Sequence, residues 1–374
     1  MGVPGHPYDE VVRPLYGRAR EALPAGTRWF DAHTHVGDQD PDGLTATAPD
    51  IVAGLDRAGQ DRALVFPLHE PGGYTAANAV VRQAAARSSG RLVALARIDP
   101  NRDAVAEARR GLEGGAVGFK LHPRSERFGL PHAAVEAVVA LAHEARAPVL
   151  LHAGRGIPRL GKAAVDLARR YPGARIILAH AGISDLGWLA PLTAELANLY
   201  FDTAWWQASD LLHLFTHVPP ARILYASDMP YGSGRIAGLA ALRAGLAVGL
   251  GRDALAAVVG GQLARVVDGS APLDLGPAPG AGALGPRRVA HERALAHLAS
   301  AVHAIFRGGD PIEPLALALS ACQTSSPEPA LATIAALVEV ALDERAGAQP
   351  GDRWPGSYAT IAAQLVAGTP DVPV

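Results

Sequence analysis

The stretch Trp-Phe-Asp-Ala-His-Thr-His occupies residues 29–35, where a short apolar run closes on two histidines. In an extended strand successive side chains point to opposite faces, so His33 and His35 share a face that Thr34 does not. Two imidazoles that converge from one strand end make half of a transition-metal site. In a chain with 14 histidines such a pair also arises by chance. The prediction of a metal site therefore depends on whether other strand ends supply the missing ligands.

The chain around this stretch alternates short apolar runs with helix-like segments from residue 27 to about residue 270. Brief β-branched or Leu-rich runs are typical of buried parallel strands. The expected strands are 28–34, 62–67, 91–98, 116–122, 147–152, 175–180, 199–204 and 222–228. The expected helices between them are 50–59, 75–88, 102–113, 131–146, 161–170, 184–197, 207–217 and 235–249. Eight strand–helix pairs in about 240 residues predict an α/β fold of the (β/α)8 TIM-barrel type.

A doubly wound open sheet is the alternative fold. Such a sheet would need a Gly-rich phosphate-binding turn after its first strand. The segment His33-Thr-His35-Val-Gly37 stands at that place and is not such a turn. The sequence therefore favours the closed barrel.

The remaining chain divides into three parts outside the barrel. Residues 1–26 form an N-terminal segment before the catalytic domain at 27–270, a Pro- and Gly-rich linker spans 271–287, and a helical accessory region spans 288–374. Its expected helices are 288–307, 311–322 and 327–346, with a further short one at 357–367. Three short helices make a thin core on their own. We therefore expect this region to dock on the barrel or to mediate homo-oligomerisation, and nothing in its sequence indicates chemistry.

Composition restricts the partners of the protein. The formal net charge of −2 offers no basic excess for neutralising nucleic-acid phosphates. Cys322 is the single cysteine, so no intrachain disulfide can form, which suits a reducing cytoplasm. Residues 1–25 lack the apolar core of a signal peptide, and no apolar run reaches membrane-spanning length. We expect a cytoplasmic protein with a small-molecule substrate and no nucleic-acid or membrane partner.

Polar residues close three of the later strands as well. His152 ends the fifth apolar run, His180 the sixth and Asp228 the eighth. Catalytic residues of a TIM barrel lie at these carboxyl ends, and three imidazoles with one carboxylate are a natural ligand set for Zn²⁺ or a similar ion. A single histidine at a strand end is more often a hydrogen-bonded polar group than a ligand. Together with His33 and His35, these residues predict one metal-dependent catalytic centre.

The same segments resemble those of the amidohydrolase superfamily, in particular the amidohydrolase-related branch that includes decarboxylases and lactonases. The resemblance covers roughly residues 28–270. It rests on Asp31-Ala-His33-Thr-His35-Val-Gly37, Gly118-Phe-Lys120-Leu-His122-Pro123, Leu151-His152-Ala-Gly154, Ala179-His180-Ala-Gly182 and Ser227-Asp228-Met-Pro230. Residues 261–267 also look like the closing helix of this branch, although Gln262 stands where the branch usually has Asn. These motifs are specific for the superfamily and say little about the substrate.

The resemblance implies one divalent metal ion, for which Zn²⁺ is favoured and Mn²⁺ or Fe²⁺ are alternatives. His33, His35 and His152 would be metal ligands. Asp228 would be a further ligand or the base that takes a proton from bound water. His180 would lie near the metal and polarise or protonate the substrate.

Lys120 leaves the number of metal ions open. Some superfamily members carry a carbamylated fourth-strand lysine that bridges two metals. In the branch that this chain resembles, the Lys-x-His-Pro segment usually accompanies one metal, so a single ion is expected and a dinuclear site on carbamylated Lys120 is the alternative. Charged and aromatic side chains near strand ends could also bind an anionic or apolar substrate. The weaker candidates for this role are Lys120, His122, Arg124, Arg155 and Trp205.

The leading functional hypothesis is a metal-dependent hydrolase. In it, hydroxide formed on the metal attacks an amide, lactone or ester-like bond of a small substrate, with Asp228 as proton shuttle and His180 stabilising developing charge. The same residues also support metal-dependent, non-oxidative decarboxylation of a small aromatic or unsaturated carboxylic acid. A catalytically silent barrel that serves as a binding module is a third possibility, but such a barrel has no need for the complete ligand set.

Overall fold

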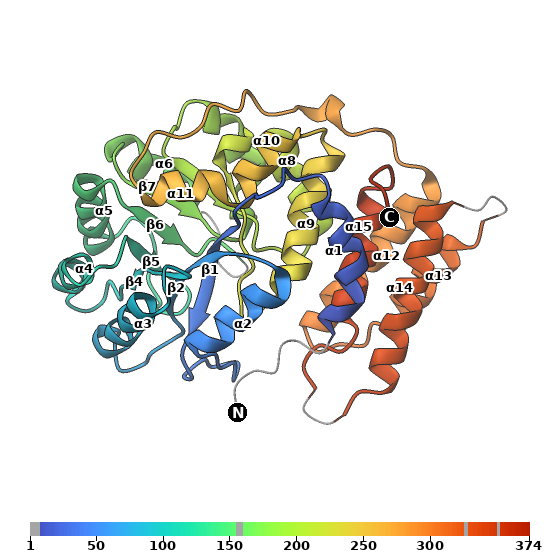
Figure 1. Ribbon diagram of the computed structural model, residues 1–374, viewed down its shortest axis with the longest axis horizontal. Helices are drawn as coiled ribbons and strands as arrows, with labels where there is room; N and C mark the ends of the chain where they lie inside the picture. The colour runs from blue at the N-terminus through green and yellow to red at the C-terminus, as the bar shows by residue number, and fades with distance from the viewer. Residues whose placement is uncertain (1–7, 155–159, 325–327, 350–351) are drawn as a thin grey trace.

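Strands and helices alternate around a barrel, and a separate group of helices stands beside it (Figure 1). The computed structural model describes residues 8–154, 160–324, 328–349 and 352–374. Its strands are β1 Phe30–Val36, β2 Arg62–Pro67, β3 Leu92–Ala94, β4 Ala96–Arg97, β5 Phe119–Leu121, β6 Pro148–Leu151, β7 Arg175–Leu178, β8 Leu199–Asp202 and β9 Ile223–Leu224. Every pair of hydrogen-bonded neighbours is parallel and consecutive in the chain. The predicted α/β class and order of elements are confirmed.

The nine labelled strands provide eight positions of a closed barrel. β3 and β4 are separated only by Leu95, whose N–H still donates to the Val65 carbonyl of β2 at 3.0 Å. On the other side of β1, the Ala32 N–H donates to the Tyr225 carbonyl just after β9 at 2.9 Å. The residues after β9 continue along β1, where Thr34 forms a parallel bridge with Met229. These bonds join the last strand position to the first and bring residues 33–35 beside residue 228.

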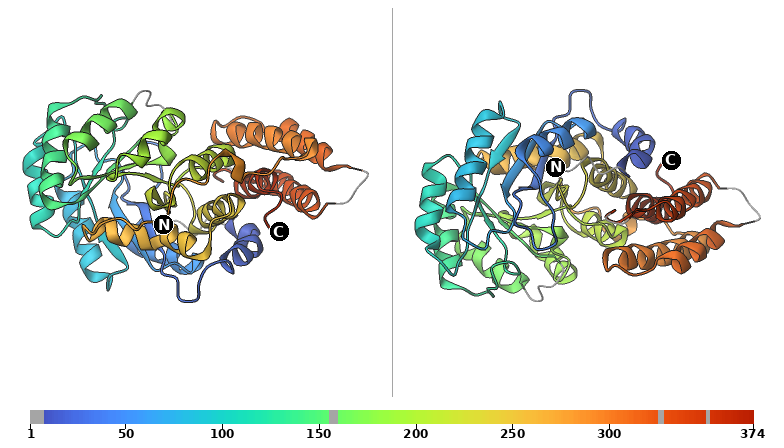
Figure 2. Two further views of the ribbon diagram at one scale, coloured as in Figure 1. Left: turned by 90° about the horizontal axis from the view of Figure 1, so that it is seen from above. Right: turned by 90° about the horizontal axis from the view of Figure 1, so that it is seen from below.

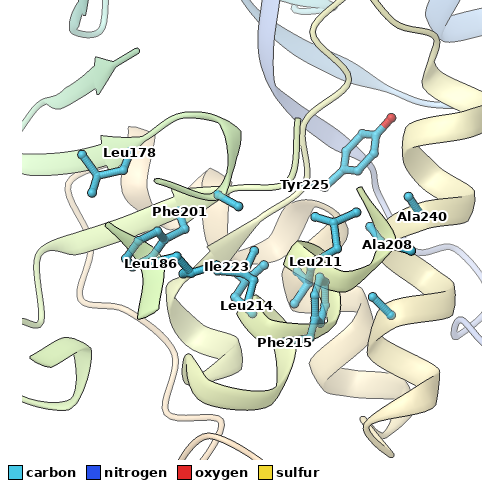
Figure 3. Packing of buried hydrophobic residues seen from close by; sticks show 14 of the residues in the cluster. Leu178, Leu186, Phe201, Ala208, Leu211, Leu214, Phe215, Ile223, Tyr225 and Ala240 are labelled. Atoms are coloured by element: carbon cyan, nitrogen blue, oxygen red, sulfur yellow. The ribbon is translucent and has the colours of Figure 1, made fainter. Parts of the chain in front are cut away.

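Helices cover the outside of the barrel and bury its strands. They are α2 Ala48–Ala58, α3 Thr75–Arg87, α4 Ala104–Glu113, α5 Ala133–Ala145, α6 Gly161–Arg170, α7 Leu186–Leu189, α8 Ala208–His217, α9 Gly234–Ala247, α10 Arg252–Ala256 and α11 Gln262–Val267, preceded by α1 Arg13–Arg20. Figure 3 shows part of the apolar layer between the strands and the helices α8 and α9, which includes Leu178, Phe201, Leu211, Phe215, Ile223 and Ala240. Burial of each large apolar side chain contributes about 1.5–3 kcal/mol. This layer fixes the strand ends that carry the polar residues.

The prediction of one helix over 184–197 is wrong. α7 ends at Leu189, and a 3₁₀ segment follows at Ala190–Ala194. Pro191 lacks an N–H, and its ring would clash with the carbonyl four residues earlier if the α-helix continued. The helical periodicity of the apolar residues alone did not account for this proline.

Four helices form the C-terminal unit, α12 Val289–Phe306, α13 Ile312–Cys322, α14 Pro329–Ala346 and α15 Ser357–Gly368. The unit lies against one side of the barrel (Figure 2). Every residue of α15 is buried, because this helix packs between α12 and α14 on one side and α8 and α9 on the other. Gln364 joins the two parts, since its side-chain carbonyl accepts the Ala208 N–H at 2.9 Å. Homo-oligomerisation through these helices stays a prediction.

Arg243 of α9 holds the chain after α15. Its buried guanidinium donates to the Thr369 hydroxyl at 2.9 Å, the Thr369 carbonyl at 2.8 Å and the Val372 carbonyl at 3.1 Å. Arg243→Leu should lower the free energy of unfolding by about 2–4 kcal/mol, because it leaves buried acceptors without donors. Urea denaturation would measure this loss. The exposed Arg109→Leu is the control, and equal unfolding midpoints for the two variants would contradict the prediction.

In the part of the chain that the structure describes, each helix is too short or too polar to cross a membrane.

Candidate metal centre

His33, His35 and Asp228 bring three potential ligand atoms together at the centre of the barrel mouth. The Asp228 Oδ1 atom lies 3.0 Å from His35 Nε2 and 3.3 Å from His33 Nε2. These atoms all lie within 4.8 Å of one another. The two rings face the same side of β1, with centroids 5.0 Å apart, as strand alternation predicts. The first and last strand positions of the barrel therefore supply one candidate metal site.

Asp202, the last residue of β8, orients His33. Its Oδ2 atom lies 2.8 Å from His33 Nδ1, and both side chains are almost fully buried. The Asp202 Oδ1 atom accepts the backbone N–H of His180 at 2.7 Å and of Ala204 at 3.0 Å. With Nδ1–H donating to the carboxylate, the Nε2 lone pair of His33 faces the site, as metal-ligating histidines require.

His152 and His180 contact each other in the same cavity. His180 Nε2 lies 3.0 Å from His152 Nδ1, and His180 Nδ1 donates to the Ala204 carbonyl at 2.7 Å. The His33 and His180 rings are 5.1 Å apart, so this pair adjoins the triad. His122 stacks on His152 with centroids 3.8 Å apart. The four predicted ligands His33, His35, His152 and Asp228 and the predicted catalytic residue His180 thus all line one cavity.

The backbone at two of these residues has an uncommon conformation. Asp228 has φ of 59° and His180 has φ of 56°, both in the left-handed region. Non-glycine residues adopt this region at an energetic cost, and such strained residues cluster at functional sites. Hydrogen bonds at Asp228 and at the residue before it hold this conformation, because the Asp228 N–H donates to the His33 carbonyl at 2.9 Å and the Ser227 N–H donates to Asp31 Oδ1 at 3.0 Å.

The electrostatics of the centre favour neutral imidazoles. Burial lowers the pKa of His33, His35 and His152 well below the ordinary value, with neighbouring cationic groups adding to the effect. Neutral imidazole is the form that binds a metal. Burial also raises the pKa of the Asp228 carboxyl well above its ordinary value, although the nearby Lys120 lowers it. A bound cation would favour the ionised carboxylate in the same way as Lys120 does.

Lys120 lies within the centre rather than at its edge. The fully buried Nζ atom is 3.3 Å from His33 Nε2 and 4.9 Å from the centroid of the Phe66 ring. Burial and the Arg97 charge lower the pKa of Lys120 to about 7. Neutral lysine is therefore accessible near neutral pH. Metal stoichiometry distinguishes a free amine at Lys120 from a carbamylated one.

These residues fit a divalent cation in their chemistry and spacing. Zn–N and Zn–O bonds of about 2.0–2.2 Å at tetrahedral angles separate neighbouring ligand atoms by about 3.3–3.6 Å. The Asp228 Oδ1 atom lies close to this separation from both histidines, at 3.3 Å from His33 Nε2 and 3.0 Å from His35 Nε2. Within the described residues, His35 Nδ1 and His152 Nε2 are buried without a hydrogen-bond partner. The site is thus rich in nitrogen and oxygen donors that the protein itself does not fully satisfy.

A cavity of about 650 Å³ opens above this centre. Of the weaker candidates, Arg124, His122 and Trp205 line it. Lys120 lies beneath it against His33. Arg155 falls outside the described residues.

Three polar residues that shape the site, Asp202, Arg97 and Glu126, were not identified from the sequence. Asp202 orients His33, as described above. Arg97 lines the cavity from β4, and its guanidinium donates to Glu126 Oε1 at 2.7 Å with both side chains buried. The carboxylate at the end of the apolar run Leu199–Asp202 was a usable signal, since the same rule identified Asp228. Arg97 also closes an apolar run at the end of β4, but this pattern did not show that Arg97 pairs with Glu126, which follows a different strand.

The fold and the centre together define a (β/α)8 barrel with a candidate divalent-metal site at the carboxyl ends of its strands. Residues 30–261, more than half of the chain, match the family model described as Amidohydrolase, and the chain belongs to that family. The predicted resemblance is therefore confirmed. Members of this family are metal-dependent enzymes, and the reaction differs among them.

Solved structures with the same fold include a 2,6-dihydroxybenzoate decarboxylase from Rhizobium, which is 13% identical with a TM-score of 0.51 over 65% of this chain and 99% of that one. An unconfirmed amidohydrolase from Staphylococcus aureus is 14% identical with a TM-score of 0.53 over 64% of this chain and 99% of its own. At such identities the likeness shows the fold alone. No functionally curated protein matches the sequence.

Proposed function

We propose that the protein is a metal-dependent hydrolase that cleaves an amide, lactone or ester-like bond of a small molecule. The observation that carries this proposal is the position of Asp228 Oδ1, within 3.3 Å of both His33 Nε2 and His35 Nε2 at the floor of the cavity. A carboxylate at this place can both hold a cation and exchange a proton with a bound water. The proposal rests on these contacts together with membership of the family.

Each residue of the centre has a defined part in this reaction. His33 and His35, with His152, would hold one divalent cation, which supplies a Lewis acid and an activated water when bound. Asp228 accepts the proton that leaves the attacking water and returns it to the leaving group. His180 presents the lone pair of Nε2, because its Nδ1–H donates to Ala204, so it takes up a proton before it can give one to the substrate.

Decarboxylation of an aromatic or unsaturated acid is the second candidate reaction, and a specific observation favours it. Trp205 and Trp206 stack at 4.0 Å along the cavity wall, and Arg97 and Arg124 line the same cavity. Aromatic rings and arginines suit a planar carboxylate. In this reaction the centre would hold the acid, and a protonated side chain would deliver a proton to the carbon that loses CO₂.

Metal analysis and product analysis test the proposal together. Protein purified without chelator should contain close to one equivalent of a transition metal, and two equivalents would favour the carbamylated Lys120 site. Less than about 0.2 equivalents, without activity on adding Zn²⁺ or Mn²⁺, would contradict any metal-dependent reaction. A panel of lactones, amides and aromatic acids, assayed for hydrolytic products and for CO₂, separates the two reactions. The small net charge keeps nucleic acid outside this panel.

A further inference from the structure

The C-terminal helical unit forms part of the wall of the cavity above the metal centre. Phe306 at the end of α12 and Trp354 before α15 line the same cavity as His33 and Asp228. Tyr358 and Ile361 of α15 line it too. These residues lie outside the range 30–261 that matches the family. The unit therefore adds a surface to the site that the shared barrel does not supply.

Aromatic rings connect this added surface with the metal centre. Trp205 lies 6.3 Å from the His180 ring and stacks on Trp206 at 4.0 Å. Trp206 lies 4.7 Å from Phe306, and Phe306 lies 5.1 Å from Trp354. We refer to Trp205, Trp206, Phe306 and Trp354 as the aromatic wall. It begins beside the catalytic histidines and ends on the C-terminal unit.

The C-terminal half of the wall is held in place by polar contacts on both sides. Arg353, next to Trp354, donates to the Asp42 carbonyl in the loop after β1, and its guanidinium lies 5.2 Å from the Trp354 ring centroid. At the other end, Gln364 donates from Nε2 to the Gln207 side-chain carbonyl at 2.7 Å, directly before α8. A surface tied to the barrel in this way presents its rings at a fixed distance from the reacting centre.

The size of the cavity and the length of the wall indicate more than a single-ring substrate. A volume of about 650 Å³ falls within the range of about 300–1,000 Å³ that is typical of sites for drug-sized ligands. The candidate metal ligands lie at the centre end, around His33 and Asp228, whereas the rings of the aromatic wall lead away from them toward Trp354. A ligand that matches this division has its reacting polar group at one end and an aromatic group at the other.

We propose that the aromatic wall is a second subsite, which binds an aromatic group carried away from the reacting bond of the substrate. This inference rests on the proposed function for the location of the reacting bond. A subsite on the aromatic wall would make the C-terminal unit a determinant of substrate specificity. The wall extends the site beyond the strand-to-helix loops of the barrel.

Calorimetric titration of the protein as purified with two probes tests the subsite. Benzoate places one ring near the centre, and biphenyl-4-carboxylate adds a second ring that can reach the wall. We expect the biphenyl acid to bind about tenfold more tightly than benzoate, because stacking and burial of the second ring favour it. Phe306→Leu and Trp354→Leu should each reduce that ratio to about threefold or less, with the benzoate Kd changed by less than about twofold.

Leu317→Ala is the matched control, because Leu317 belongs to the same unit, is 40% exposed and does not line the cavity. The control should keep the tenfold ratio. Equal affinities of the wild-type protein for the two acids, no measurable binding of the biphenyl acid, or an unchanged ratio in both leucine variants would overturn the proposal. Both substituted positions are half-buried, and thermal melts would show that the variants fold. The measured quantity is a ratio of binding constants, so the result does not depend on whether the metal centre catalyses hydrolysis or decarboxylation.

Discussion

Asp228→Asn is expected to lower kcat by a factor of about 10²–10⁴, the usual contribution of a positioned proton-transfer group. The asparagine has the size of the aspartate and can keep the backbone conformation at φ of 59°. It cannot accept the proton of the attacking water, and its amide is a weaker cation ligand than a carboxylate. The measurement is kcat at saturating metal and substrate, with metal content determined on the same sample.

The control for this experiment is Asp40→Asn. Asp40 lines the same cavity and accepts the Tyr231 hydroxyl, which an asparagine oxygen can also do. This variant should keep kcat within about tenfold of the wild-type value, because Asp40 is not one of the three clustered candidate ligands. A fully metallated Asp228→Asn variant with nearly unchanged kcat would show that another group carries the proton.

The strands, helices and metal-site residues that could be predicted are those that a local sequence pattern marks. Apolar runs of strand length and helical periodicity define most of the barrel, and His33, His35 and Asp228 stand out because each interrupts or closes such a run. Parallel strands bring their carboxyl ends to one edge, so these residues had to lie near one another. The parallel order of the strands is therefore enough to predict that these residues line one cavity, without knowledge of how individual side chains pack.

Contacts across the barrel could not be predicted in the same way. Asp202 contacts His33 although 169 positions separate them in the sequence. A local pattern predicts that both residues lie at strand ends, but it does not predict which side chains face each other. The role of Phe306 and Trp354 was hidden for the same reason, because each has the pattern of an ordinary apolar residue in a helical region. Only the docking of α15 against α8 and α9 brings them to the cavity.

Asp202→Asn should lower the affinity for the metal by about 10–100-fold, the usual effect of removing a carboxylate partner from a ligating histidine. The carboxylate now fixes the proton of His33 on Nδ1 at a distance of 2.8 Å. An amide at this place can present its NH₂ group to Nδ1, and the histidine would then favour the tautomer whose Nε2 carries the proton. That tautomer offers no lone pair to a cation.

Competition with a chromogenic chelator gives the affinity, and kcat as a function of added Zn²⁺ separates positioning from misfolding. A positioning role predicts that excess metal restores much of the lost kcat, whereas a damaged fold would not respond. Asp185→Asn is the control, because Asp185 is also a buried carboxylate, which accepts the Gly161 N–H at 2.8 Å away from the centre. Wild-type affinity in Asp202→Asn would mean that His33 is not held as a ligand by this contact. The Asp228–His33–His35 triad would then need a different source for the orientation of its first histidine.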